Sequence, residues 1–165
     1  MWLFLKNLIF TVFIPGTVAV YIPYRIINDS YTLFNIHWRT LQILSAVFIL
    51  SGAVIYFWCL WHFAVTGRGT PVPIDAPRHL VIKGLYRYVR NPMYIGVLMV
   101  ILGWAGFYNS YAVLRYAVLV WLIFYGIIMI IEEPILRSKF GESYKDYCKQ
   151  VKRWIPTKGY IEKNN

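Results

Sequence analysis

The sequence predicts an all-α integral membrane protein, with about four transmembrane helices followed by an amphipathic helix at the membrane surface. Its 165 residues are 59% hydrophobic and only 15% charged, whereas soluble proteins average about 45–50% apolar and about 25% charged residues. Uncharged windows cover residues 7–24, 40–67 and 91–131, the last interrupted only by Arg115. These runs are too long and too apolar for a soluble domain of this size.

The windows place the boundaries of the four spans. A helix needs about 20 residues to cross a bilayer, so the window 91–131 must hold two passes. We expect the turn between them at residues 107–111, Phe-Tyr-Asn-Ser-Tyr, because this stretch contains residues that end helices. The predicted helices therefore cover about residues 6–26, 40–64, 92–107 and 112–131. A cleaved signal peptide is the alternative for the first helix, but Pro23-Tyr24-Arg25 is a poor cleavage site.

The basic residues predict the orientation in the membrane. Of the 17 Lys and Arg residues, all but Arg25, Arg39 and Arg115 fall on one side of a four-span topology. Lys and Arg accumulate on the cytoplasmic side, so both termini and residues 65–91 are expected in the cytoplasm. Basic residues beside a membrane also attract anionic lipid headgroups. The formal charge of +10 therefore needs no nucleic-acid partner.

We expect one membrane domain over residues 1–165. It would comprise two N-terminal helices (1–64), a cofactor-binding and catalytic half (65–156) and a tail (157–165). Cys59 and Cys148 are predicted too far apart in membrane depth to form a disulfide. Neither lies in a Cys-x-x-Cys pattern or has histidines at ligand spacing, so we expect no metal site. The sequence does not set an oligomeric state.

Two cytoplasmic segments carry most of the polar chemistry. The first, residues 66–94, is dense in Gly and Pro, which predicts a fixed irregular loop rather than a helix. Its end overlaps the stretch GLYRYVRNPMYIG, residues 84–96, which places two arginines and three tyrosines directly before an apolar span. Each has a structural alternative. Arg87 and Arg90 would serve as membrane-edge anchors, and the tyrosines would form an interfacial aromatic belt.

The second segment, EEPILRSKFGESYKDYCKQVKRWIP, predicts an amphipathic helix that leaves the fourth span. Its apolar residues recur at spacings of 4, 4, 3 and 4, which is one helical face: Leu136, Phe140, Tyr144, Tyr147 and Val151. Such a helix lies on the membrane surface or over a cavity that opens there. Glu132 and Glu133 precede Pro134, so their structural alternative is to stabilise a helix N-terminus through its dipole.

In order, the chain presents GRGTPVP, GLYRYVRNPMYIG, two short apolar passes, EEPILRSKFGESYKDYC and RWIP. Over about residues 63–156 it resembles the membrane-embedded methyltransferases of the isoprenylcysteine carboxyl methyltransferase and phospholipid methyltransferase group. The resemblance implies a site for S-adenosylmethionine at the cytoplasmic face, and a lipid or lipidated methyl acceptor that enters from the bilayer. The residue types agree with a sulfonium, a carboxylate, an ammonium group and a flat adenine, because both segments offer arginines, carboxylates and tyrosine rings.

The resemblance also implies individual roles, carried over where residues match the group's motifs. The candidate cofactor-binding residues are Gly67, Gly69, Tyr86, Arg90, Asn91, Pro92, Tyr94, Gly96, Glu132, Glu133, Tyr144 and Tyr147. Gly96 would let its helix approach either the cofactor or a neighbouring helix. The candidate catalytic residues are Glu132 or Glu133 as a base, and Arg137 or Arg153 to orient an anionic acceptor.

The expected reaction is direct in-line methyl transfer to a nucleophile of a membrane-resident acceptor, with positioning contributing about 7–11 kcal/mol. Asn91 stands where the prenylcysteine enzymes usually carry histidine, and an amide is neither acid nor base near neutral pH. This difference weakens the expectation of a prenylated cysteine carboxylate as acceptor. An NADPH-dependent isoprenoid or sterol reductase and a non-catalytic lipid-binding scaffold are the alternatives. A transporter is disfavoured because the spans hold almost no ionisable residue.

Overall fold

The computed structural model describes residues 13–29, 39–62, 80 and 82–161. In this part of the chain every regular element is helical, as predicted. The elements are η1 (Thr17–Tyr21), α2 (Ile22–Asp29), α3 (Arg39–His62), η3 (Gly84–Arg87), α4 (Pro92–Phe107), α5 (Tyr111–Ile127), η4 (Ile128–Glu132) and α6 (Glu133–Gln150). Of the short elements, η1 and η4 are π-helical turns and η3 is a 3-10 turn.

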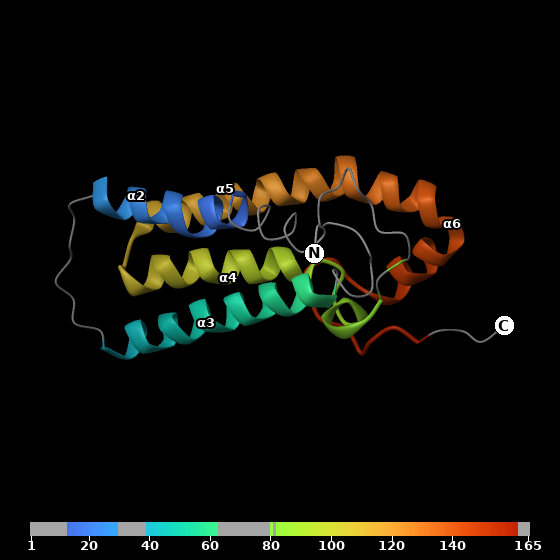
Figure 1. Ribbon diagram of the computed structural model, residues 1–165, viewed down its shortest axis with the longest axis horizontal. Helices are drawn as coiled ribbons and strands as arrows, with labels where there is room; N and C mark the ends of the chain where they lie inside the picture. Colours follow the sequence, from blue (N-terminus) through green and yellow to red (C-terminus); the bar gives the residue numbers. More distant parts are fainter. Residues whose placement is uncertain (1–12, 30–38, 63–79, 81, 162–165) are drawn as a thin grey trace, which may run out of the picture.

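The helices α2, α3, α4 and α5 lie side by side along the long axis of the molecule (Figure 1). Helix α4 packs against both α3 and α5, and α2 contacts α5. The core where they meet is built mainly from small and β-branched side chains: Ala19, Tyr56, Val97, Val100, Ile101, Ala105, Val113, Ala117 and Val120. All of these side chains are apolar or aromatic, and the buried Ser45 and Cys59 of α3 are among the few other side chains that the described part of the bundle encloses.

Two helical runs among the described residues are long and apolar enough to cross a membrane, Thr40–His62 and Tyr111–Gln150. Helix α4 is a shorter apolar helix of 16 residues. Large apolar side chains on the outer faces, such as Leu44, Phe57 and Leu122, are more than half exposed. An apolar surface of this extent favours a lipid environment over water.

Most predicted boundaries agree with the structure. Helix α4 has the predicted bounds, and α3 covers the predicted second helix as far as His62. The first predicted helix begins outside the described residues, and its described part continues to Asp29. The predicted turn at 107–111 is also confirmed: Asn109 adopts a positive φ of 49°, which asparagine tolerates better than most residues. Ser110 then caps α5 by accepting a hydrogen bond from the Val113 amide at 3.3 Å.

Helices α3 and α4 approach closely because small residues line their contact. A Cβ atom on Gly96 would lie 2.7 Å from the Gly52 carbonyl oxygen, and one on Gly103 would lie 3.0 Å from the Ser45 carbonyl oxygen. Such contacts are typical of helices packed within membranes. Of the two alternatives for Gly96, the structure shows the approach to a neighbouring helix. This close packing holds the start of α4, and with it Asn91 and Pro92, in place beside α3.

The fourth predicted helix, 112–131, does not end at residue 131. Helix α5 continues through the π turn η4 into α6, and Glu132 has helical angles of −68° and −51°. Because Pro134 lacks an amide hydrogen, the α-helical bond to the carbonyl of residue 130 cannot form, and the π turn carries the helix past this position. Glu132 and Glu133 therefore lie inside a continuous helical run, and the helix-dipole alternative for them does not hold.

The predicted amphipathic helix is divided at Gly141, whose angles of 52° and −125° break α6. Positive φ values of this kind favour glycine. Figure 1 shows that the chain turns back here, so the second part of α6 returns toward the ends of α3 and α4. The predicted apolar residues still gather in one cluster with Leu80, Ile82 and Tyr160. Val151 belongs to this cluster but has extended angles and lies just beyond the helix.

Candidate functional site

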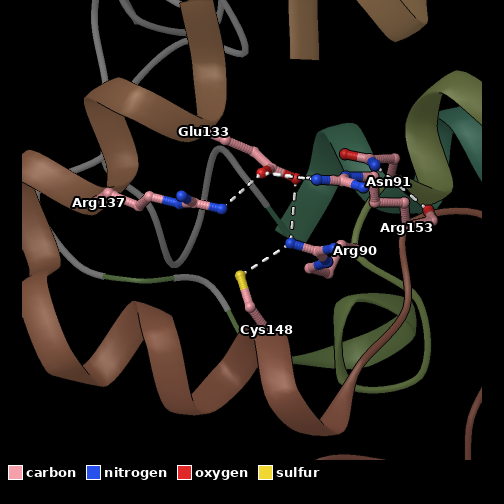
Figure 2. Close-up of polar contacts among 6 residues, drawn as sticks. All are labelled: Arg90, Asn91, Glu133, Arg137, Cys148 and Arg153. Atoms are coloured by element: carbon pink, nitrogen blue, oxygen red, sulfur yellow. Dashed lines mark hydrogen bonds and ion pairs between the residues drawn. The ribbon is translucent and has the colours of Figure 1, made fainter. Parts of the chain in front are cut away.

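The site is centred on Glu133, whose carboxylate contacts three arginines from different segments (Figure 2). Arg153 makes a two-pronged contact, with Nε 2.6 Å from Oε1 and Nη2 3.0 Å from Oε2. Nη1 of Arg90 lies 3.1 Å from Oε1, and Nη2 of Arg137 lies 3.3 Å from Oε2. The Glu133 side chain is 5% exposed and that of Arg90 10%, whereas that of Arg137 is 56% exposed. Arg137 therefore forms the outer edge of the cluster.

Arg90 reaches Glu133 because the segment before α4 is held on the C-terminal segment. The η3 turn brings the chain to Arg90, whose amide donates to the Lys152 carbonyl at 2.9 Å. Its Nη1 also contacts Sγ of Cys148 at 2.8 Å. Pro92 then occupies the first turn of α4, where its missing amide hydrogen costs nothing and its fixed φ suits the helix. The Arg-Asn-Pro element is thus a bend that directs one side chain into the site.

Asn91 is buried, with 9% of its surface exposed. Its Nδ2 donates to the carbonyl oxygen of Arg153 at 3.2 Å. Figure 2 shows Asn91 beside the backbone of Arg153, while the Arg153 guanidinium extends to Glu133. The side chain of Asn91 therefore acts on the backbone of a residue in the cluster.

Glu132 occupies a neighbouring environment. The Tyr94 hydroxyl donates to Oε1 of Glu132, and the Tyr94 ring packs on Phe124 of α5 with centroids 4.6 Å apart. The paired glutamates of the sequence thus have separate partners. Glu133 is surrounded by guanidinium groups, whereas Glu132 is held by a phenol.

The second half of α6 adds two buried tyrosines. The Tyr147 hydroxyl donates to the Tyr86 carbonyl, and the Tyr144 and Tyr147 rings pack with their centroids 6.2 Å apart. The Tyr86 side chain lies near Cys59 of α3, and burial raises the pKa of Tyr86 well above its ordinary value. Tyr86 therefore stays a neutral phenol, which packs the loop before α4 against the end of α3.

The C-terminal segment closes the site from outside. Thr157 donates its amide to the Tyr88 carbonyl at 2.8 Å, and Tyr160 donates its amide to the Arg87 carbonyl at 2.8 Å. Gly159 adopts a φ of 100° beside the Tyr88 ring. Trp154, next to Arg153, packs its ring against Trp121 of α5 with centroids 6.3 Å apart. These contacts tie residues 152–160 to both α5 and the segment before α4.

The structure brings together most of the predicted site residues. Direct polar contacts link Arg90, Glu133, Arg137 and Arg153, with Asn91 joined through the backbone of Arg153. Gly96 faces α3 instead, and Gly67 and Gly69 lie outside the described residues. Sequence reasoning missed Cys148 as a member of the cluster. Its place four residues after Tyr144 on one helical face was the available signal.

The electrostatics of the site favour an anionic ligand. Three guanidinium groups contact the single carboxylate of Glu133. Even when the charge of the neighbouring Glu132 is counted, the group carries a net positive charge. Nε of Arg90 is buried and has no hydrogen-bond partner among the described residues. A buried donor without a partner costs about 1–3 kcal/mol, and an incoming oxygen acceptor would remove that cost. The arrangement suits a ligand that carries a carboxylate.

The sequence of this chain is similar to those of a known protein family. The family described as phospholipid methyltransferase matches residues 40–143. This range covers α3, α4, α5 and the first part of α6, together with the Glu132–Glu133 pair and Arg90. It is well over half of the chain.

One curated relative is the protein-S-isoprenylcysteine O-methyltransferase of Schizosaccharomyces pombe. It is 37% identical to this chain over 78 residues, which are 47% of this chain and 33% of the relative. The match thus spans about a third of the relative's length. With the family match over residues 40–143, the chain belongs to the phospholipid methyltransferase family.

Proposed function

We propose that this protein is a membrane methyltransferase that uses S-adenosylmethionine to methylate a lipid or lipidated acceptor. The observation that carries the proposal is the cluster in which Arg90, Arg137 and Arg153 converge on the carboxylate of Glu133. It lies at the end of the bundle, where the polar segments meet the apolar helices. A hydrophobic acceptor in the bilayer and a polar donor from the cytoplasm would both reach this position.

Methyltransferases of this family use S-adenosylmethionine. When bound, the sulfonium of this cofactor supplies an activated methyl group. The residues of the cluster also fit the other polar groups of S-adenosylmethionine. The excess positive charge and the buried Nε of Arg90 suit the cofactor's carboxylate, because guanidinium groups bind carboxylates with paired hydrogen bonds. The carboxylate of Glu132 suits the ammonium group or the ribose hydroxyls.

The two glutamates would then play different parts. Both oxygens of Glu133 already accept hydrogen bonds from guanidinium groups, so Glu133 organises the arginines. Glu132 accepts a hydrogen bond from Tyr94. We assign Glu132 the role of proton acceptor when the methyl acceptor is an amine or hydroxyl, since that reaction releases a proton. A carboxylate acceptor needs no base.

Arg137 is the residue we assign to the acceptor. Its side chain is 56% exposed and touches Glu133 through one nitrogen at 3.3 Å, so part of its fork stays available. A guanidinium placed there would hold a phosphate or carboxylate of the acceptor at the edge of the site. Two acceptor classes fit this chemistry: the amine headgroup of a phospholipid and the carboxylate of an isoprenylated cysteine.

The membrane arrangement belongs to the same proposal. We place four helices across the bilayer with both termini in the cytoplasm, because the basic residues gather at one end of such a topology. The second half of α6 would lie at the cytoplasmic interface, where Lys145 and Lys149 are exposed and meet the anionic headgroups.

Calorimetric titration of the detergent-solubilised protein with S-adenosylmethionine tests this function, with NADPH as the comparison ligand. We expect saturable binding of S-adenosylmethionine alone. Incubation of membranes with the methyl-labelled donor, followed by lipid extraction, would then identify the acceptor class. Binding of NADPH alone would support a reductase, and binding of neither ligand by folded protein would support a lipid-binding scaffold.

A further inference from the structure

Asn91 has a contact that neither its motif nor its family match explains. Its Nδ2 donates to the Arg153 carbonyl across a sequence separation of 62 residues. The residue is 9% exposed, so this hydrogen bond is made largely out of water, where the loss of a partner costs most. The amide of Asn91 is directed at the backbone of a neighbour.

Arg153 needs such a tether because no regular element holds it. Helix α6 ends at Gln150, and the residues around Arg153 form bends without a helix or strand. The Arg90 amide holds the preceding residue through the Lys152 carbonyl at 2.9 Å. The Asn91 side chain holds Arg153 itself. Two adjacent residues before α4 therefore fix two adjacent residues of the C-terminal segment.

The guanidinium of Arg153 depends on this backbone position. It makes the shortest of the contacts to Glu133, 2.6 Å from Nε to Oε1, and a second one of 3.0 Å. A two-pronged contact requires both nitrogens to meet both oxygens in one plane, so a shift of the backbone would open it. The other arginines each touch Glu133 through a single nitrogen.

We propose that Asn91 is a positioning residue: its side-chain amide fixes the Arg153 backbone and so aligns the Arg153 guanidinium with Glu133. This positioning role requires a hydrogen-bond donor at residue 91 and does not require an acid or a base. A histidine can supply an N–H from its ring at a similar reach, so Asn91→His should preserve the alignment. Asn91→Leu keeps the approximate size and branching but removes the donor.

The first experiment reads the Arg153–Glu133 contact without any ligand. In protein labelled with nitrogen-15 arginine, the Nε–H resonance of Arg153 is identified by its disappearance in Arg153→Lys. In Asn91→Leu we expect it to move toward the resonances of exposed arginines, and in Asn91→His to stay near its original position. The other arginine resonances report whether each variant is folded. An unmoved Arg153 resonance in folded Asn91→Leu would overturn the proposal.

Thr157→Val is the matched control. The Thr157 hydroxyl also donates to a carbonyl across the same two segments, that of Tyr88 at 3.0 Å, but it does not hold Arg153. We expect this variant to leave the Arg153 resonance in place. If Thr157→Val moves the resonance as far as Asn91→Leu does, any loosening of the C-terminal segment has the same effect, and the specific role of Asn91 is refuted.

The second experiment rests on the proposed function and measures calorimetric binding of S-adenosylhomocysteine. We expect Asn91→Leu to raise the Kd about three- to tenfold, the loss of about one hydrogen bond. In an Arg153→Lys background the same substitution should change the Kd by less than about twofold, because its effect passes through Arg153. Equal weakening in both backgrounds would mean that Asn91 touches the ligand itself.

The two experiments test the positioning role and the proposed function independently. If wild-type protein binds no S-adenosylhomocysteine, the proposed function is wrong, while the arginine resonance still decides whether Asn91 positions Arg153. If the ligand binds but the resonance does not respond to Asn91→Leu, the positioning role is wrong and the proposed function stands.

Discussion

The contact between α3 and α4 and the cluster around Glu133 are held together in opposite ways. In the first, backbones meet through small residues, with Gly52 and Gly96 at the centre and no charge involved. In the second, long charged side chains meet from positions as far apart in the sequence as Arg90 and Arg153. The helix pair depends on shape, and the cluster depends on charge balance. Substitutions in the two regions should therefore lower stability or ligand binding for different reasons and by different amounts.

The largest effect should come from removing the charge at the centre of the cluster. Glu133→Ala would leave Arg90 buried without its anion, and breaking a buried ion pair typically costs about 3–5 kcal/mol of stability. Reversible unfolding in mixed detergent micelles would measure this loss. Glu142→Ala, which removes an exposed carboxylate paired with Lys145 at 2.6 Å, is the matched control and should cost less than about 1 kcal/mol. Equal losses in both variants would show that the cluster contributes no special stability.

The second effect should come from added volume between the helices. In Gly96→Leu the new side chain would meet the Gly52 carbonyl, only 2.7 Å from its Cβ, and overpacking of this kind costs about 1–3 kcal/mol. Gly126→Leu is the control, because a Cβ on Gly126 of α5 meets nothing within 4 Å. The same unfolding measurement compares the two. A Gly96→Leu protein as stable as Gly126→Leu would mean that the two helices separate easily.

A smaller effect is expected at the turn between α4 and α5. Ser110→Ala removes the cap that accepts a hydrogen bond from the Val113 amide, a change that typically costs about 1 kcal/mol. Ligand binding should not change, because the turn joins the end of α4 to the start of α5, whereas the cluster lies at the opposite ends of these helices (Figure 1). Calorimetry and unfolding on the same variant would separate the two properties. A loss of binding without a loss of stability would contradict this separation.

The smallest effect on stability should come from Arg137→Ala. Its ion pair is half exposed, and exposed pairs are worth about 0–1 kcal/mol. Its expected effect is on the reaction: the KM for the lipid acceptor should rise, while binding of S-adenosylhomocysteine changes little. Lys139→Ala, two residues away on α6 and also exposed, serves as the control. An unchanged acceptor KM in Arg137→Ala would remove this residue from the acceptor site.

The bundle could be predicted from the sequence because its information is local. Long apolar windows mark the spans, and the Asn-Ser step marks the turn at Asn109. The apolar windows could not show that the helix continues past residue 131. Pro134 after two glutamates is typical of a helix start, and only the π turn of η4 shows that the helix passes through.

The sequence named most residues of the cluster around Glu133 but not their pairings. The motif resemblance brought Arg90, Glu133 and Arg153 into one group, and the structure joins them. No pattern of spacing shows that Glu133 takes all three arginines while Glu132 takes Tyr94, or that Cys148 contacts Arg90. The contacts of Cys148 and Arg153 depend on the reversal of the chain at Gly141, which brings the end of α6 back to the start of α4 (Figure 1).

The measurement that tests the central claim most directly is calorimetric titration of S-adenosylhomocysteine into wild type, Glu133→Gln and Glu142→Gln. Glutamine keeps the shape of the side chain but removes the charge that gathers the arginines. Binding should be lost or weakened at least about tenfold in Glu133→Gln, the loss of about 1.4 kcal/mol or more, and should be unchanged in Glu142→Gln. Wild-type affinity in folded Glu133→Gln would contradict the assignment of this cluster as the methyl-donor site.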